Sequence, residues 1–152
     1  MQNVNRELIE QIVRQVLAAQ FSQSADPNRS VDQSGSIAVR GNSIKPEPFN
    51  TGKAGDKVWL TDIYALNESP RLGAGIMEMD HTTFDWTLNY DEIDYIIEGT
   101  LEIIVDGRAT VGYAGDVILI PKGSKIQFST PNTCRFLYVV YPANWAEQKQ
   151  SK

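Results

Sequence analysis

The sequence predicts an all-β domain of the sandwich or barrel type, preceded by one amphipathic helix and a polar linker. Three observations predict this order: apolar residues at helical spacing near the N-terminus, a polar stretch after them, and short strand-like runs from Ile37 onward. Strands that recur about every 8–12 residues favour a sandwich or barrel over a fold that alternates strands with helices.

The first element is a helix expected over residues 3–20, within an N-terminal segment 1–21. Its apolar residues recur at spacings of one, three and four and therefore share one stripe: Leu8, Ile9, Ile12, Val13, Val16 and Leu17. Two interpretations stand. The stripe packs on the domain or on a partner subunit, or it docks as a tethered helix in a groove of another protein.

Residues 22–36 are expected to form a flexible linker. They are polar, and Val31 is their only large apolar residue. Such a stretch buries too little apolar surface to offset the entropy lost on ordering. A disordered tail is expected at the other end, over residues 147–152.

The β domain is expected over residues 37–146. Its strand-like runs are KVWLTDIYA, GIMEM, IDYII, LEIIV, DVILI, KIQFS and RFLYVVY. Turn signals separate them: Asp106-Gly107, Ala114-Gly115-Asp116, Pro121-Lys122-Gly123 and Pro131-Asn132. Asp-Gly between alternating runs is a strong signal for a tight hairpin.

Charge and composition exclude several classes of protein. The formal net charge of −5 disfavours nucleic acid and anionic membranes as partners. No apolar run is long enough to span a bilayer, and charged residues interrupt every candidate secretory signal. The one cysteine, Cys134, allows no intrachain disulfide and is expected to be buried. We therefore expect a cytoplasmic protein.

Two segments resemble the paired motifs of the cupin family, whose fold is a small jelly-roll β-barrel. Glu92 and Gly99 match the end of the first motif, within DEIDYIIEGTLEI. Gly115, Pro121 and Gly123 match the second, within GDVILIPKGSKI.

The metal-binding positions of those motifs are not matched. Trp86 and Leu88, or Asp85 and Thr87, stand at the histidines of the first motif, and Ile126 stands at the histidine of the second. One remaining carboxylate is not a site for zinc, iron or nickel, so we expect no tightly bound transition metal. The lone histidine, His81, lies outside the motif and is expected at the surface.

A closer resemblance is to the EutQ family of ethanolamine-utilisation proteins. The runs WTLNYDEIDYIIEG, AGDVILIPKGSKI and RFLYVVYPANW carry it, over about residues 84–145. It implies a homodimer associated with a bacterial microcompartment. It also implies an acetate kinase that converts acetyl phosphate and ADP into acetate and ATP, with Mg²⁺. Residues 3–20 resemble encapsulation peptides, so a shell protein is their expected partner.

The candidate catalytic residues are Tyr90, Glu92 and Asp94. Strand alternation puts them on one face with Trp86, Leu88 and Ile96, and the Glu92 match indicates that this face points inward. Glu92 and Asp94 would then hold Mg²⁺, which prefers oxygen ligands. The opposite interpretation places Ile93, Tyr95 and Ile97 in the core and leaves both acids in solvent.

The candidate substrate-binding residues are Trp86, Asp85, Lys122 and Lys125, although a plain solvated turn is the favoured interpretation of the two lysines. The chain has no phosphate-binding loop of the usual spacing, because Gly52-Lys53 is followed by alanine. A non-catalytic protein of the same fold, binding a shell protein or a small metabolite, therefore stands as the alternative.

Overall fold

A computed structural model describes residues 9–14 and 26–148. The chain divides into two compact units, Met1–Ser43 and Ile44–Lys152. Each unit is described by itself.

In the first unit, residues 9–14 are helical and Ile9, Ile12 and Val13 are about half exposed. The remainder of the helix predicted over residues 3–20 lies outside the described residues. Two strands follow, β1 (Arg29–Val31) and β2 (Ile37–Val39), which pair antiparallel, and then a short 3-10 helix, η1 (Gly41–Ser43).

The β1–β2 hairpin corrects the prediction of a flexible linker for its described part from Arg29 onward, whereas residues 22–25 of that linker lie outside the described residues. Local turn chemistry holds it, since the side chain of Asp32 accepts a hydrogen bond from the Ser34 N–H and Gly35 adopts a φ of 88°. The prediction failed because apolar burial was its only criterion. The hairpin also moves the start of the larger unit from residue 37 to Ile44.

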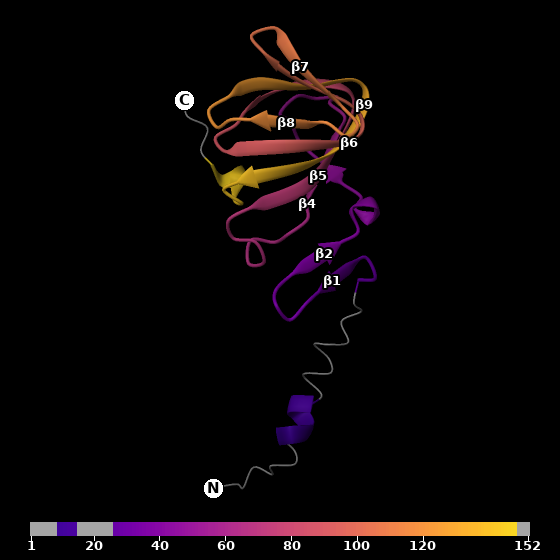
Figure 1. Cartoon of the computed structure of the whole chain (residues 1–152), viewed down its shortest axis with the longest axis vertical. Helices are drawn as coiled ribbons and strands as arrows, with labels where there is room; N and C mark the ends of the chain where they lie inside the picture. The colour runs from indigo at the N-terminus through magenta and orange to yellow at the C-terminus, as the bar shows by residue number, and fades with distance from the viewer. Residues whose placement is uncertain (1–8, 15–25, 149–152) are drawn as a thin grey trace. The chain divides into compact units, whose positions relative to one another are not determined.

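The second unit is a set of antiparallel strands that curve around one core (Figure 1). The strands are β3 (Glu47–Pro48), β4 (Val58–Asp62), β5 (Gly73–Thr87), β6 (Asp91–Val105), β7 (Arg108–Tyr113), β8 (Val117–Ile120) and β9 (Lys125–Tyr141). The hydrogen-bonded order is β3-β4-β5-β9-β6-β7, with β8 also paired to β6. This order does not return to β3, so the sheet is not a closed ring. A 3-10 helix, η2 (Trp145–Glu147), follows β9 and extends one residue into the predicted tail.

Two of the long strands each combine runs that the sequence had separated. IDYII and LEIIV are both parts of β6, and KIQFS and RFLYVVY are both parts of β9. The predicted turn at Pro131-Asn132 is instead a bulge in β9. Thr130 pairs with Thr82 and Thr133 with Asp80, so the two residues between them face only His81. A bulge tolerates proline because its residues leave the hydrogen-bonded ladder.

The bend in β6 depends on Gly99. Its φ is 76°, and a Cβ atom there would lie 1.8 Å from the carbonyl oxygen of Thr133 on β9. Both conditions require glycine. The bend lets β6 pair with β8 over its first half and with β7 over its second, while β9 pairs with both halves.

The Asp106-Gly107 hairpin between β6 and β7 is confirmed. Val105 pairs with Arg108, and the two loop residues have φ values of 48° and 76°, as a tight two-residue hairpin turn requires. β7 was not among the predicted strands, because its run, RATVGY, contains few large apolar residues.

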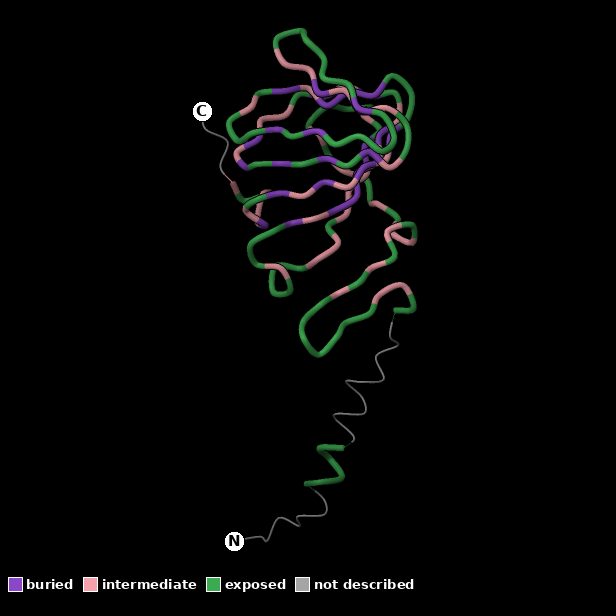
Figure 2. The backbone as a smooth tube through the Cα atoms, viewed as in Figure 1, coloured by how far each residue is buried: buried purple, intermediate pink, exposed green. Residues whose placement is uncertain are grey.

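The core lies on the inner face of these strands, and buried and exposed residues alternate most regularly along β8 and the first half of β6 (Figure 2). It is built from aromatic and aliphatic side chains that include Met77, Phe84, Ile96, Phe128 and Phe136. Within the described residues, no helix has the length and apolar character that crossing a membrane requires.

Candidate functional site

The inner face of β6 carries two carboxylates. Glu92 is 5% exposed and Asp94 is fully buried, whereas Ile93 and Tyr95 between and beside them are each 45% exposed. The inward orientation of the two acids is therefore confirmed, and the opposite interpretation, with the isoleucines inside, is wrong. We refer to Glu92 and Asp94 as the acid pair.

The pairing of β6 on both sides accounts for this orientation. Glu92 faces Ile120 on β8 and Val140 on β9, and Asp94 faces Ile118 and Tyr138. All four of these partners are buried residues of the inner face. A shift of one residue in register would turn the acids outward, but it would also expose Ile96.

One part of the predicted geometry is corrected. Residues 86–96 do not form a single strand, because β5 ends at Thr87 and β6 begins at Asp91. A short turn joins the two strands, with the Leu88 N–H bonded to the Ser124 carbonyl. Trp86 nevertheless contacts the same interior, because its indole N–H donates a hydrogen bond of 2.8 Å to the Tyr90 hydroxyl.

Glu92 lines a small cavity, which we call the inner cavity. Its volume is about 20 Å³, room for roughly one water molecule. Its other walls are largely aromatic and aliphatic: Phe49, Leu60, Met77, Phe84, Trp86, Tyr90, Phe128, Tyr138, Val140 and Trp145. Glu92 is the one charged residue among them.

A wider opening, which we call the mouth, adjoins the inner cavity. Its volume is about 180 Å³, and it shares four walls with the inner cavity: Phe49, Trp86, Tyr90 and Trp145. Its remaining lining residues are Thr87, Asn89, Ala146 and Gln148. The inner cavity and the mouth therefore have four aromatic walls in common.

Compensating contacts are few: a hydrogen bond with Tyr90 only partly offsets the burial of Glu92. Neither carboxylate oxygen of Asp94 has a hydrogen-bond partner among the described residues. Burial, reinforced by the neighbouring charge of Glu92, raises the pKa of Asp94 well above its usual range. Burial also raises the pKa of Glu92, to about 7. The pair therefore retains a proton at pH values where ordinary carboxylates have lost theirs.

Two tyrosines flank the pair. Burial raises the pKa of Tyr90 and of Tyr138 above the usual phenol range, so both hydroxyls stay protonated and can donate. The Tyr138 hydroxyl donates to Asp62 at 2.6 Å. Its ring crosses Gly75, where a Cβ atom would lie 1.9 Å from the hydroxyl oxygen.

Trp145 places the C-terminal segment against the aromatic walls. Its indole N–H donates to Asp62 at 3.3 Å, and its ring lies 5.8 to 6.4 Å from the rings of Phe49, Trp86, Tyr90 and Tyr138. Aromatic rings at these separations attract one another.

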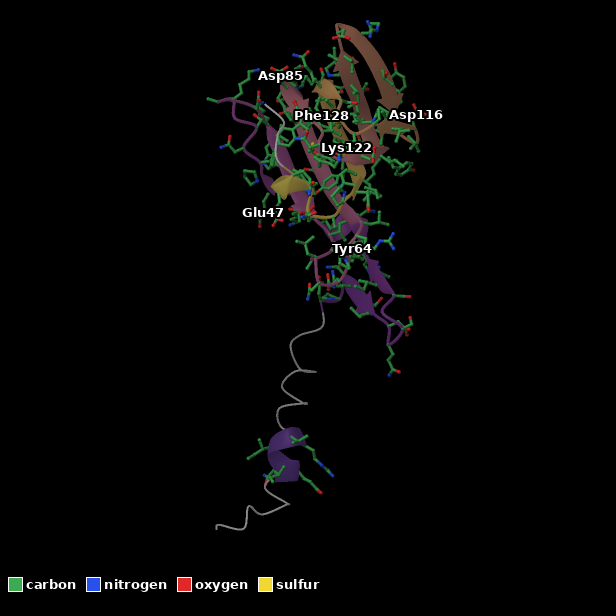
Figure 3. All side chains as sticks on the ribbon, turned by 90° about the vertical axis from the view of Figure 1, so that its left-hand side faces the viewer. Glu47, Tyr64, Asp85, Asp116, Lys122 and Phe128 are labelled. Atoms are coloured by element: carbon green, nitrogen blue, oxygen red, sulfur yellow. The ribbon has the colours of Figure 1, made fainter. Side chains whose placement is uncertain are left out.

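The candidate substrate-binding residues are not all in this interior. Asp85 is exposed and accepts a hydrogen bond from the Gln127 side chain. With Lys125 and Trp86 it lines a separate hollow of about 520 Å³, which we call the outer depression. Lys122 is also exposed, on the β8–β9 loop, where its N–H bonds to Asp91 (Figure 3). The structure thus does not bring the two lysines to the acid pair.

Several residues of the site had no predicted role. Tyr138 shares the inner face of β9 with Phe136 and Val140. Strand alternation along RFLYVVY was a sequence signal from which its inward orientation could be predicted. Phe49 and Trp145 lie outside the long strands, so no periodic pattern marks them.

His81 and Cys134 line neither the inner cavity nor the mouth. His81 is exposed at the β5 bulge, with a φ of 43° and its ring against Asp80. Cys134 is buried, as predicted. Within residues 9–14 and 26–148, no group of three or more His, Cys, Asp or Glu side chains is arranged to hold a metal ion.

Comparisons with known proteins agree on one family. A family model described as ethanolamine utilisation protein EutQ matches residues 4–147. The protein named acetate kinase EutQ of Clostridioides difficile is 50% identical over 152 residues, which cover 96% of this chain and 97% of that protein.

Solved structures show the same relationship. The EutQ protein of Clostridium difficile has a TM-score of 0.79 and 53% identity over 83% of this chain and 94% of its own. A cupin domain of Schizosaccharomyces pombe Cnp3 has a TM-score of 0.55 with 16% identity, covering 70% of this chain and 77% of its own. The predicted cupin fold is confirmed.

The burial of the acid pair predicts an unusual dependence of stability on pH. Folding raises the pKa of both acids, so their contribution stabilises the fold below the unfolded pKa and is lost as the pH rises through the folded pKa. We expect the free energy of unfolding to fall by a few kcal/mol between about pH 5 and about pH 8, since one pKa unit corresponds to about 1.4 kcal/mol.

Urea denaturation across this pH range measures the effect. The double variant Glu92→Gln/Asp94→Asn should lose the fall, whereas Glu98→Gln/Asp106→Asn, which changes two exposed acids, should keep it. An identical pH dependence in the wild type and the first variant would contradict a buried acid pair.

Proposed function

The chain belongs to the EutQ family of ethanolamine utilisation proteins, and we propose that it is an acetate kinase that interconverts acetyl phosphate and ADP with acetate and ATP. The observation that carries this proposal is the relative named acetate kinase EutQ, which matches at 50% identity over nearly the full length of both chains. The acid pair is the candidate catalytic centre.

The acid pair fits the chemistry of a magnesium ion that arrives with its substrate. Mg²⁺ in phosphoryl-transfer enzymes is commonly held by one or two carboxylates together with phosphate oxygens and water. The unpartnered oxygens of Asp94 supply such a carboxylate, and Glu92 supplies the other. When bound, the ion would neutralise charge on the transferred phosphoryl group.

The phosphates need cations that the inner cavity lacks. The outer depression has a cation, Lys125, in its lining, and it shares Trp86 and Thr87 with the mouth. We assign the nucleotide to the outer depression, with Lys125 and Asp85 at its wall, and acetyl phosphate to the mouth. Lys122 lies on a loop that is bonded to Leu88, one residue from the mouth residue Asn89.

A coupled assay with acetyl phosphate, ADP and Mg²⁺ tests the assignment. Glu92→Gln and Asp94→Asn should each lower kcat/KM by about 100-fold or more, because each removes a charge from the proposed magnesium site. Glu98→Gln makes the same chemical change as Glu92→Gln at an exposed position that lines none of the proposed binding spaces, and it should leave the activity unchanged. Unaltered activity in both interior variants would place the reaction elsewhere.

A non-catalytic role is the second candidate. The described residues that line the inner cavity and the mouth include no Lys, Arg or His, which is unusual for a site that handles phosphates. A protein of this fold would then bind a shell protein or a small metabolite. Absence of turnover by the wild-type chain in the same assay would favour this role.

We also propose that the protein is a homodimer, and the outer face of β6 and β8 supports this. Ile93 pairs with Leu119 and Tyr95 with Val117, and all four side chains are 45 to 67% exposed. Tyr141, opposite Asp91, extends the patch onto β9. Contiguous exposed apolar surface of this kind commonly marks a protein interface.

Sedimentation velocity tests the dimer. Leu119→Asp should convert the protein to monomers, because it puts a charge in the centre of the patch. Leu66→Asp, at an exposed leucine outside the strands, should leave it dimeric. A wild-type monomer, or a Leu119→Asp dimer, would refute this interface.

The N-terminal helix is proposed to carry the protein into a microcompartment by binding a shell protein. Its exposed residues Ile9, Ile12 and Val13 support this role. Deletion of residues 1–20, and the change Ile12→Asp, should abolish co-purification with compartments without altering the barrel's near-UV circular dichroism. Gln11→Asp, beside the apolar residues, should have little effect. Normal encapsulation of the deletion variant would exclude the helix as the signal.

A further inference from the structure

We propose that the inner cavity and the mouth form a binding site for a small primary ammonium ion, with the ammonium group against Glu92 and a short carbon chain between the aromatic rings. The inference uses the acid pair of the proposed function but does not require kinase activity. It rests on charge, on the nature of the walls and on the size of the two spaces.

The charge of the site favours a cation. Glu92 lines the inner cavity, and Asp94, two residues along the same strand face, is fully buried with both carboxylate oxygens unpartnered. Among the described lining residues of the inner cavity and the mouth, none is cationic. A buried carboxylate is stabilised when a positively charged donor pairs with it. A positively charged ligand would provide the cation that the described lining residues lack.

The aromatic walls favour an organic cation. Phe49, Trp86, Tyr90 and Trp145 line both spaces, and neighbouring ring centroids lie 5.8 to 6.4 Å apart. The faces of such rings attract ammonium groups and also remove the attached methylene groups from water. A bare metal ion would be attracted by the ring faces, but it has no methylene groups that the rings could remove from water.

The sizes of the spaces favour a primary amine. The inner cavity holds about one water molecule, and an –NH₃⁺ group is of similar size, whereas a quaternary ammonium is several times larger. The mouth, about 180 Å³, takes the remaining atoms. Asn89, Gln148 and Thr87 line it and offer hydrogen bonds to a hydroxyl at the far end of a short amino alcohol.

Isothermal titration calorimetry of the full chain, without nucleotide, acetyl phosphate or Mg²⁺, tests the proposal. The probe is 2-aminoethanol, and the matched controls are 1,2-ethanediol, which lacks the charge, and tetramethylammonium, which lacks N–H donors. We expect saturable binding of 2-aminoethanol and affinity weaker by about tenfold or more for either control, as the loss of a charged hydrogen bond predicts.

Variants test the assignment to these residues. Glu92→Gln should weaken 2-aminoethanol binding by about tenfold or more, and Glu98→Gln should leave it unchanged. Because Mg²⁺ is proposed to use the same acid pair, added Mg²⁺ should weaken amine binding in the wild type. The wild-type comparison of three ligands does not depend on any variant folding.

Two results would overturn the proposal: no saturable binding of 2-aminoethanol by the wild type, or equal binding of the amine and 1,2-ethanediol. Both are independent of turnover, so a chain without kinase activity can still bind the amine, and an active kinase can still fail to bind it.

Discussion

The pairing of β6 between β8 and β9 is the constraint on which the rest of the structure depends. It fixes the register in which Glu92 and Asp94 face inward, opposite buried residues of both neighbouring strands. The same register turns Ile93 and Tyr95 outward. One choice of register therefore creates both an acidic interior and an apolar exterior, although hydrophobic burial alone would favour the reverse. The exposed apolar face supports the proposed dimer, and the buried acids are stabilised by a retained proton or by a cation.

The aromatic cluster explains how such an interior is kept from bulk water. Trp145 closes one side, held by Asp62 through the same oxygen that accepts the Tyr138 hydroxyl hydrogen bond. Trp86 and Phe49 close the others, and only about 20 Å³ remains empty beside Glu92. In so dry a space, charge interactions are stronger than in water, and an uncompensated carboxylate is costly. A cationic ligand, whether the proposed magnesium ion or the proposed organic ammonium, would therefore be bound more strongly here than at an exposed carboxylate.

The sequence predicted the β class, the hairpin at Asp106-Gly107 and the inward face of β6, because turn chemistry and strand alternation are local signals. It did not predict that Pro131 and Asn132 lie within one strand, since a bulge is recognised only when the partner strand, here at His81, is known. Lys122 and Lys125 are exposed, as the favoured interpretation of a solvated turn predicted, and the alternative that they contact substrate beside the acid pair depends on the whole fold and had no local signal. Trp145 and Phe49 belong to no periodic pattern, and three-dimensional packing alone reveals their role.

The central claim is that Glu92 and Asp94 lie together in the interior and that burial raises the pKa of both. Carbon-13 NMR of the side-chain carboxyl carbons during a pH titration measures this most directly, with the resonances of Glu92 and Asp94 assigned by Glu92→Gln and Asp94→Asn. The account predicts that the chemical shift of each carboxyl carbon also reports the titration of the other group. It predicts that at least one group titrates well above the usual carboxyl pKa of about 4. Independent titration of both carboxylates near that usual value would contradict it.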